Sequence, residues 1–387
     1  MGFRPLPLRP IRRSDHEGLN RLHRAVGWPE RSPAGWRWLE DNPARQDLDA
    51  PMGWVVADEQ DRPAAMLGNF VQRFRLGSRR LHAATGFSII VPPERKGASR
   101  GLIRALMAQP RLFARYTFNA NPRSAPLYKL FGLSPWPDKT HHLKLSWIVD
   151  PMACAQGRAL RHLLGRISAE TAARLGERLM NRRLFHPEPM RLPADITPLR
   201  DFSDSSPYDA FWRALTQEDR LLADRSPEVL RWRLADPDLT IPPLLLACVQ
   251  GGRIVGVAQA LMTKTSLIEP PCLDILDLVA LKDAPDAVAR LTRGLIDNAR
   301  SLGAAKVRLQ TVTPDLLDAL GELGVQARRE GGWGHCHALI DDPALAAAWA
   351  PTPFDGDYGV CARTPPLPRV LRARLRAATP AGQVSKA

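Results

Sequence analysis

The stretch FNANPRSAPLYKLFGL places Tyr128 in a short helical segment that follows Asn121-Pro122 and stops at Gly132. A tyrosine has an ordinary pKa of about 10, so its hydroxyl is protonated at neutral pH and can donate a proton. Ser124 stands at the predicted start of this helix. Tyr128 is therefore a candidate general acid, and the alternative is a core tyrosine that packs on a sheet.

A second candidate site precedes it, in the stretch FSIIVPPERKGASRGLIRALM. A buried strand that contains Ile89, Ile90 and Val91 is halted by two prolines, and a loop then leads into a helix. The residues of this loop are Arg95, Lys96, Gly97, Ala98, Ser99 and Arg100. Small residues let a ligand approach the backbone, and the N–H groups of a helix start attract phosphate. The loop is predicted to bind an anion, although a strand-to-helix turn needs glycine for geometric reasons as well.

The sequence does not identify the general base, which is the group that would accept a proton from the acceptor. The strand before the loop carries no carboxylate, but it carries His82, which is one candidate base. A water chain, or no base at all, is the alternative, and His82 is then an ordinary polar strand residue. Asp47, Asp49 and Asp58 are further candidates to reach the same cleft.

An internal repeat organises the chain. The stretch SPAGWRWLEDNP from Ser32 matches SPEVLRWRLADP from Ser226, and each begins with an N-cap serine followed by a proline at the first helical position. A similar offset pairs the strand-turn-strand segment 53–70 with 244–261. Self-similarity at one long offset indicates a duplicated domain rather than a solenoid.

Each half is predicted to contain strands, a hairpin and βα units in the same order, which gives an α/β fold class of the α+β, mixed-sheet kind. Two tandem domains are expected, each a mixed, mostly antiparallel sheet flanked by helices. The predicted boundaries are 1–150 for the N-terminal domain, 151–189 for a basic helical linker, 190–350 for the C-terminal domain and 351–387 for a C-terminal extension and basic tail. The linker is interpreted as a helix packed on the domains, with membrane-surface docking as the alternative.

Composition narrows the partners and the compartment. The chain has 387 residues, 44% apolar residues and a formal net charge of +14, which favours an anionic partner without choosing one. No apolar run is long enough to cross a bilayer, and the N-terminus has no signal-peptide pattern, so a cytoplasmic location is expected. The five cysteines are scattered, and the segment Gly334–His337 alternates faces on a strand, so no metal site is expected. The stretch FDGDYG, from Phe354 to Gly359, is interpreted as a turn.

The pattern N-x-x-[SA]-x-x-L-Y-x-x-x-G-[FL] begins at Asn121 and contains Tyr128, and with the basic loop before it the first half resembles the GNAT-type N-acetyltransferase superfamily. The resemblance implies that the loop binds the pyrophosphate of acetyl-CoA and that the preceding strand binds its pantetheine arm. It implies that Asn121 and Ser124 belong to the cofactor site and that Tyr128 protonates the departing thiolate. The loop departs from the family pattern, because Arg95 lies two residues before Gly97 instead of three.

The second half lacks these features. It has Lys282-Asp283-Ala284-Pro285-Asp286 where the first half has its basic loop, and Leu320 takes the place of the tyrosine. The second half is therefore expected to be a partner domain that shapes the acceptor cleft.

The predicted function is direct transfer of an acetyl group from acetyl-CoA to a primary amine of a small molecule, with an amino sugar as one candidate. The alternatives are a Fem-type aminoacyl-tRNA-dependent transferase and a non-catalytic ligand-binding tandem protein. Under the favoured reading, nucleic acid is not an expected partner.

Overall fold

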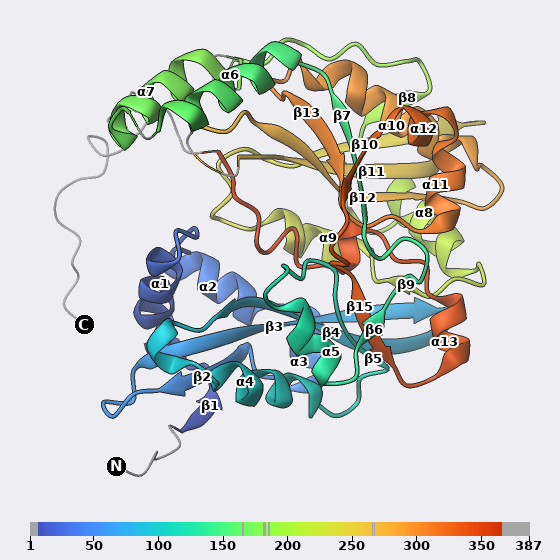
Figure 1. Ribbon diagram of the computed structural model, residues 1–387. Coiled ribbons are helices and arrows are strands. Elements are labelled where there is room, and N and C mark those ends of the chain that lie inside the picture. The colour runs from blue at the N-terminus through green and yellow to red at the C-terminus, as the bar shows by residue number, and fades with distance from the viewer. Residues whose placement is uncertain are drawn as a thin grey trace, which may run out of the picture.

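The computed structural model describes residues 7–365 except 165, 181, 182, 185, 265 and 267, so most of the predicted basic tail lies outside the described residues. Figure 1 shows two sheets, one above the other. In order across the first sheet, the strands are β1 (Leu8–Pro10), β2 (Gly53–Ala57), β3 (Pro63–Leu76), β4 (Arg79–Ile90), β5 (Ala114–Thr117), β15 (His337–Ile340) and β6 (Ser134–Pro135), and β9 (Leu222–Ala223) pairs with β3 off this path. In order across the second sheet, they are β14 (Arg328–Gly331), β7 (Leu143–Ile148), β13 (Lys306–Leu309), β12 (Cys272–Ala280), β11 (Arg253–Thr263), β10 (Leu244–Gln250) and β8 (Ile196–Pro198).

The two sheets are mostly antiparallel. Among the described strands, the ladders β4–β5 and β12–β13 are parallel and the other ladders are antiparallel. The predicted α/β class, with two mixed sheets flanked by helices, is therefore confirmed.

The helices cover the sheets and join the halves. In the first half they are α1 (His16–Ala25), α2 (Pro33–Glu40), α3 (Pro43–Leu48), α4 (Ala98–Met107) and α5 (Ala125–Leu130), with short 3-10 turns at Arg13–Asp15 and Pro93–Arg95. Between the halves stand α6 (Pro151–Leu163) and α7 (Ala169–Met180). In the second half they are α8 (Pro207–Thr216), α9 (Pro227–Leu234), α10 (Asp286–Ala299), α11 (Pro314–Leu320), α12 (Glu322–Gln326) and α13 (Pro343–Ala348), with a 3-10 turn at Pro353–Asp355.

The apolar periods of the helices explain which face of the first sheet each one covers. Leu19 of α1 and Trp36 of α2 are buried against one face, in a cluster with Phe70 of β3. Leu102 of α4 and Tyr128 of α5 are buried against the other face. The first sheet is therefore covered by helices on both faces.

The two sheets exchange strands. β7 ends the first half of the chain but pairs with β13 and β14 in the second sheet. β15 stands near the end of the second half but pairs with β5 and β6 in the first sheet. The boundaries at 150, 189 and 350 thus remain predictions about the sequence, because each sheet is completed by a strand from the other half.

The repeat helices α2 and α9 meet where the halves join. The indole rings of Trp38 and Trp232 stack with centroids 4.6 Å apart and planes 9° apart. Each indole N–H donates to the backbone carbonyl of the other tryptophan, at 2.6 and 3.0 Å. Equivalent residues of the repeat therefore contact each other reciprocally, as expected around a local two-fold axis.

The segment between the halves is a pair of helices rather than the single helix that the leucine spacing predicted. Leu160 of α6 and Ala172 of α7 are buried together with Ile268 of the second half. Arg158 and Arg178 on these helices are exposed to solvent. The pair therefore packs on the second half (Figure 1), and these arginines face solvent.

Candidate active site in the slot between β4 and β5

A cavity begins where two parallel strands separate. The β4–β5 ladder ends at the pair Thr85 and Tyr116, whereas β4 runs on to Ile90. A cavity of about 500 Å³ lies beyond this point, with Gly86–Ile89 on one side and Thr117 on the other. One backbone edge of β4 therefore faces a cavity instead of a strand, and its N–H and C=O groups can bind a ligand there.

A bulge shapes β4 within this cavity. Phe87 lies opposite Gly68 of β3, but Ile90 lies opposite Met66, so β4 contains one residue more than β3 over this interval. Ser88, inside the bulge, has φ of 49°, in the left-handed region that few residues other than glycine adopt. The bulge turns the strand locally, as bulges beside functional sites commonly do.

The hydroxyl of Tyr128 lies close to this bent strand. A Cβ atom built on Gly86 would lie 3.3 Å from the Tyr128 oxygen, so the glycine permits the close approach. The side chain is 3% exposed. Burial raises the pKa of Tyr128 well above its ordinary value, and the charge of Asp357 raises it further. The hydroxyl is therefore protonated throughout the neutral range and lies at the start of the slot.

Asn121 and Ser124 line the same cavity and build the turn before α5. The Asn121 side-chain oxygen accepts hydrogen bonds from the N–H groups of Arg123 and Ser124, both at 2.9 Å. The Ser124 hydroxyl oxygen accepts from the N–H of Asn121 at 3.1 Å. These local bonds fix the first turn of α5 and with it the direction of Tyr128.

The predicted cofactor loop lies beyond the cavity wall. Ile89 lines the cavity, Ile90 is buried in the core against α1 and α2, and Val91 is half-buried. None of the loop residues Arg95, Lys96, Gly97, Ala98, Ser99 and Arg100 is among those that line the cavity. Gly97 has φ of 98° and caps the first turn of α4.

Three cations stand at this helix start. Arg95, Lys96 and Arg100 form no ion pair with another residue in the described part of the chain. They remain available to an anion outside the slot.

His82, the candidate base on the same strand, lies elsewhere on β4 and does not line this cavity. Its Nε2 atom lies 2.9 Å from a carboxylate oxygen of Asp47, and the same carboxylate binds Arg73. His82 is outside the set of residues that line the cavity, as are Asp47, Asp49 and Asp58. The structure thus brings Tyr128, Asn121, Ser124 and Ile89 together but leaves the candidate bases apart from them.

A segment near the C-terminal end of the described residues places a carboxylate on the cavity wall, where Asp47, Asp49 and Asp58 do not lie. Residues 351–365, here called the strap, run between the two sheets (Figure 1). The Thr352 hydroxyl donates to Asp277 of the second sheet at 2.7 Å, and the Asp355 carbonyl accepts from Tyr116 of the first sheet at 2.6 Å. The strap then lines the cavity with Asp357 and Cys361, among others. The stretch FDGDYG contains part of a 3-10 turn, but its sequence does not predict that Asp357 lines the same cavity as Tyr128.

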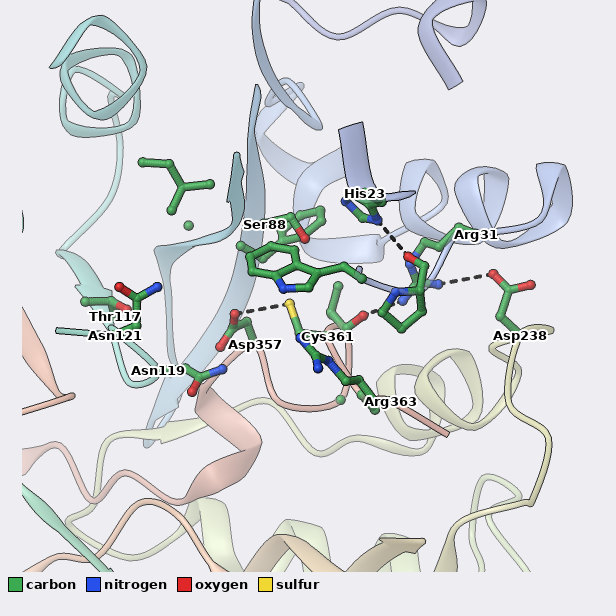
Figure 2. A pocket seen from close by; sticks show the side chains of 18 of the residues that line it. His23, Arg31, Ser88, Thr117, Asn119, Asn121, Asp238, Asp357, Cys361 and Arg363 are labelled. Atoms are coloured by element: carbon green, nitrogen blue, oxygen red, sulfur yellow. Dashed lines mark hydrogen bonds and ion pairs between the residues drawn. The ribbon is translucent and has the colours of Figure 1, made fainter. Parts of the chain in front are cut away.

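Asp357 is a buried carboxylic acid on the cavity wall. Its side chain is 6% exposed, and burial raises its pKa to about 6. Oδ2 accepts from the Cys361 thiol at 3.2 Å, whereas Oδ1 has no hydrogen-bond partner among the described residues. Figure 2 shows Asp357 between Asn119 and Cys361, across from Thr117.

The remaining wall comes from both halves of the chain. Arg31 binds the carboxylate of Asp236 at 3.3 Å and that of Asp238 at 3.6 Å, and donates to the Val360 carbonyl of the strap at 2.6 Å. His23 donates from Nδ1 to the Pro29 carbonyl at 2.8 Å, which leaves Nε2 as an acceptor without a partner among the described residues. Burial lowers the pKa of His23, so the ring is neutral. This end of the cavity (Figure 2) is polar and belongs to neither half alone.

Two kinds of site are absent from the described residues. No three side chains of His, Cys, Asp or Glu gather there as a metal site requires. His335 instead lies within hydrogen-bond distance of the Gln310 carbonyl through Nε2. No helix within the same residues has the length and apolarity to cross a membrane.

No protein-family model matches the sequence, and no curated protein matches it. Solved structures match its fold. A GCN5-related N-acetyltransferase from Anabaena variabilis ATCC 29413 aligns with a TM-score of 0.50 and 14% identity, over 87% of this chain and 73% of that chain. The N-myristoyltransferase of Saccharomyces cerevisiae, with bound myristoyl-CoA, aligns with a TM-score of 0.51 and 12% identity, over 87% of this chain and 80% of that one. The likeness to the N-acetyltransferase fold, expected from the Asn121–Tyr128 pattern, is thus confirmed.

Proposed function

We propose that this chain, which has the fold of the GNAT-type N-acetyltransferases, transfers an acetyl group from acetyl-CoA directly to a primary amine of a small molecule or amino sugar. One observation carries the proposal. A buried, protonated Tyr128 hydroxyl lies against Gly86 at the point where β4 and β5 separate into an open slot. A proton donor in that position serves a reaction that expels a thiolate.

The residues present fit an acyl-CoA donor in two respects. Gly86–Ile89 offer an unpaired strand edge to an extended, amide-containing arm such as pantetheine. The N-terminus of the ten-residue helix α4, with Arg95, Lys96 and Arg100, offers N–H groups and cations to a pyrophosphate. The thioester carbonyl would then lie near Tyr128.

The chemistry assigns Tyr128 a defined task. The acceptor nitrogen forms a bond to the thioester carbon, the carbon–sulfur bond breaks with its electron pair going to sulfur, and the Tyr128 hydroxyl protonates that sulfur. The raised pKa of Tyr128 keeps the proton in place until the thiolate develops. The acceptor enters from the wall that holds His23, Arg31 and Asp238.

The test is binding followed by turnover. Isothermal titration with acetyl-CoA measures the first step, and thiol release with amino sugars, aminoglycosides and peptides as acceptors measures the second. Myristoyl-CoA is titrated in parallel, because one structural neighbour was solved with it bound. Binding of acetyl-CoA with amine-dependent thiol release supports the proposal, and absence of acetyl-CoA binding overturns it.

The role of Tyr128 is tested by Tyr128→Phe, with Tyr208→Phe as a matched control. Tyr208 is also buried, but its hydroxyl donates to the Arg225 carbonyl at 2.6 Å and it does not line the cavity. Removal of a general acid typically costs about 10²- to 10⁴-fold in rate, so only the first variant should lose that much. Unchanged turnover in Tyr128→Phe removes Tyr128 as the acid.

A further inference from the structure

The strap holds two buried aspartates, Asp355 and Asp357, and of these only Asp355 has a cation beside it among the described residues. Asp355 is fully buried, accepts from the Trp349 indole N–H at 2.7 Å, and lies 3.5 Å from the Arg225 guanidinium. It is outside the set of residues that line the cavity. Asp355 therefore belongs to the packing between the sheets.

Oδ1 of both aspartates has no hydrogen-bond partner among the described residues, but that of Asp355 faces Arg225 away from the cavity. Asp357 is different because it lies on the cavity wall. A buried carboxylate costs free energy unless its oxygens are hydrogen-bonded. Among the described residues no side chain forms an ion pair with it, and the Cys361 thiol that donates to Oδ2 is neutral. An arrangement that keeps such an oxygen beside a cavity is explained if the oxygen has a partner in the bound state.

The same cavity holds Tyr128, so an acid and a carboxylate share one slot. The charge of Asp357 is close enough to raise the pKa of Tyr128. The Asn119 amide lies beside Asp357 and favours its charged form. The ionisable groups that interact with Asp357 include Tyr128 on α5, Tyr116 on β5, Cys361 and Tyr358 on the strap, and Lys144 on β7. Of these only Lys144 is a cation.

We infer that Asp357 is the general base of the reaction and accepts at Oδ1 the proton that the acceptor amine loses. The inference rests on the proposed acyl transfer. As the new nitrogen–carbon bond forms, the amine proton passes to Asp357, and the broken carbon–sulfur bond leaves its electron pair on sulfur. Tyr128 protonates that sulfur, and the proton on Asp357 then restores the Tyr128 hydroxyl. The sum is thioester plus amine to amide plus thiol, with no other reactant.

The pH dependence of the activity follows from the protonation state that Asp357 needs as a base. A base must be deprotonated, so activity falls as the pH drops through the pKa of about 6 that burial gives this group. The Cys361 hydrogen bond favours the charged form, so Cys361→Ala should move the fall in activity to higher pH. If the carboxylate only supported packing, the turnover rate would not follow the titration of Asp357.

The experiment compares Asp357→Asn with Asp355→Asn by thiol release from acetyl-CoA with glucosamine or kanamycin, from about pH 5 to about pH 9. In Asp357→Asn we expect turnover lower by about 10²- to 10⁴-fold, loss of the acidic limb of the pH profile, and an unchanged Kd for acetyl-CoA by titration. Asp355→Asn should keep the limb. An unchanged Kd also shows that the variant is folded. If Asp357→Asn does not fold, the shift of the acidic limb in Cys361→Ala tests the assignment instead.

Three results would decide against the inference or its premise. Wild-type turnover in Asp357→Asn overturns the assignment while leaving the proposed function intact. An acidic limb that does not move in Cys361→Ala overturns it as well. A wild-type protein that neither binds acetyl-CoA nor releases thiol with either amine overturns the proposed function, and the assignment of a base falls with it.

Discussion

Gly86 sets how close Tyr128 comes to β4. An added Cβ would lie 3.0 Å from Leu67, 3.2 Å from Leu106 and 3.3 Å from the Tyr128 oxygen. All three side chains are buried in one cluster, so the added methyl group displaces the Tyr128 hydroxyl together with the two leucines. We expect Gly86→Ala to lower acyl-transfer turnover by about 10- to 100-fold, because a small displacement of a catalytic group is costly.

Gly294→Ala is the matched control for this prediction. Gly294 lies within α10, and its added Cβ would meet no atom closer than 3.8 Å. Alanine in a helix interior is more stable than glycine by about 1 kcal/mol, so this variant should gain stability and keep its turnover. The measurements are thiol release and thermal unfolding. Equal turnover in the two variants would mean that the approach of Tyr128 to β4 has no role.

Asp357 should make the protein less stable at neutral pH than it would be with a neutral side chain. Its pKa rises from 3.8 to about 6 on folding, so the folded state binds more protons than the unfolded state between these pH values. Stability therefore falls as the pH rises through that window, by at most about 3 kcal/mol for this group. Asp357→Asn should be more stable than wild type at about pH 8, and the gain should shrink below about pH 4.

Urea unfolding of both proteins at the two pH values checks this prediction. The wild-type protein at low pH is its own control, since its aspartate is then neutral in the folded and unfolded states. A gain in stability that is equal at both pH values would show that the buried charge is not its source.

At the scale of elements, the loop before α4 should select the anionic end of the donor. Arg95→Ala and Arg100→Ala each remove a cation that has no ion-pair partner among the described residues. We expect each to weaken acetyl-CoA binding by about tenfold, as loss of a charge-assisted hydrogen bond does. Acetyl-pantetheine lacks the pyrophosphate, so its affinity should not change.

Titration of both ligands with both variants separates this role from a general loss of structure. Arg158→Ala, on the exposed side of α6, is the control with the same change of charge. If acetyl-pantetheine affinity falls as much as acetyl-CoA affinity, the loop acts on the shape of the slot and not on phosphate.

Local sequence patterns predicted the elements well, because periodicity and caps act over a few residues. The serine-proline starts of α2 and α9 and the glycine at 97 are such signals. Residues of the cavity wall could be predicted where they follow one βαβ unit, as for Ile89, Asn121, Ser124 and Tyr128. The place of Asp357 on the same wall could not be predicted, since it depends on the path of the strap between two sheets. The place of His82 outside the wall could not be predicted either, because alternation along a strand does not tell how far a residue lies from the splayed end.

For the whole molecule, the exchange of β7 and β15 implies that the halves depend on each other. A fragment of residues 1–150 has β5 without its neighbour β15, and β7 without the sheet that it joins. Unpaired strand edges and an uncovered core favour aggregation. We expect this fragment to show no cooperative thermal unfolding, in contrast to the full chain.

Circular dichroism during heating and size-exclusion chromatography of the fragment test this expectation. A version that carries residues 334–345 on a flexible linker restores β15 and should recover part of the cooperative transition. A fragment of 1–150 that is monomeric and unfolds cooperatively without β15 would contradict the dependence.

The exchanged strands are joined to their sheets through one covalent chain, which makes the pairing an intramolecular event. If two separate proteins exchanged strands in this way, their complex would dissociate on dilution, since association costs translational entropy. Here the partner strand is present at a fixed effective concentration however dilute the solution is. The walls of the slot come from β4, the strap and the loop at Asp238, all within one chain. A single molecule therefore contains the complete slot, whether the protein concentration is nanomolar or millimolar.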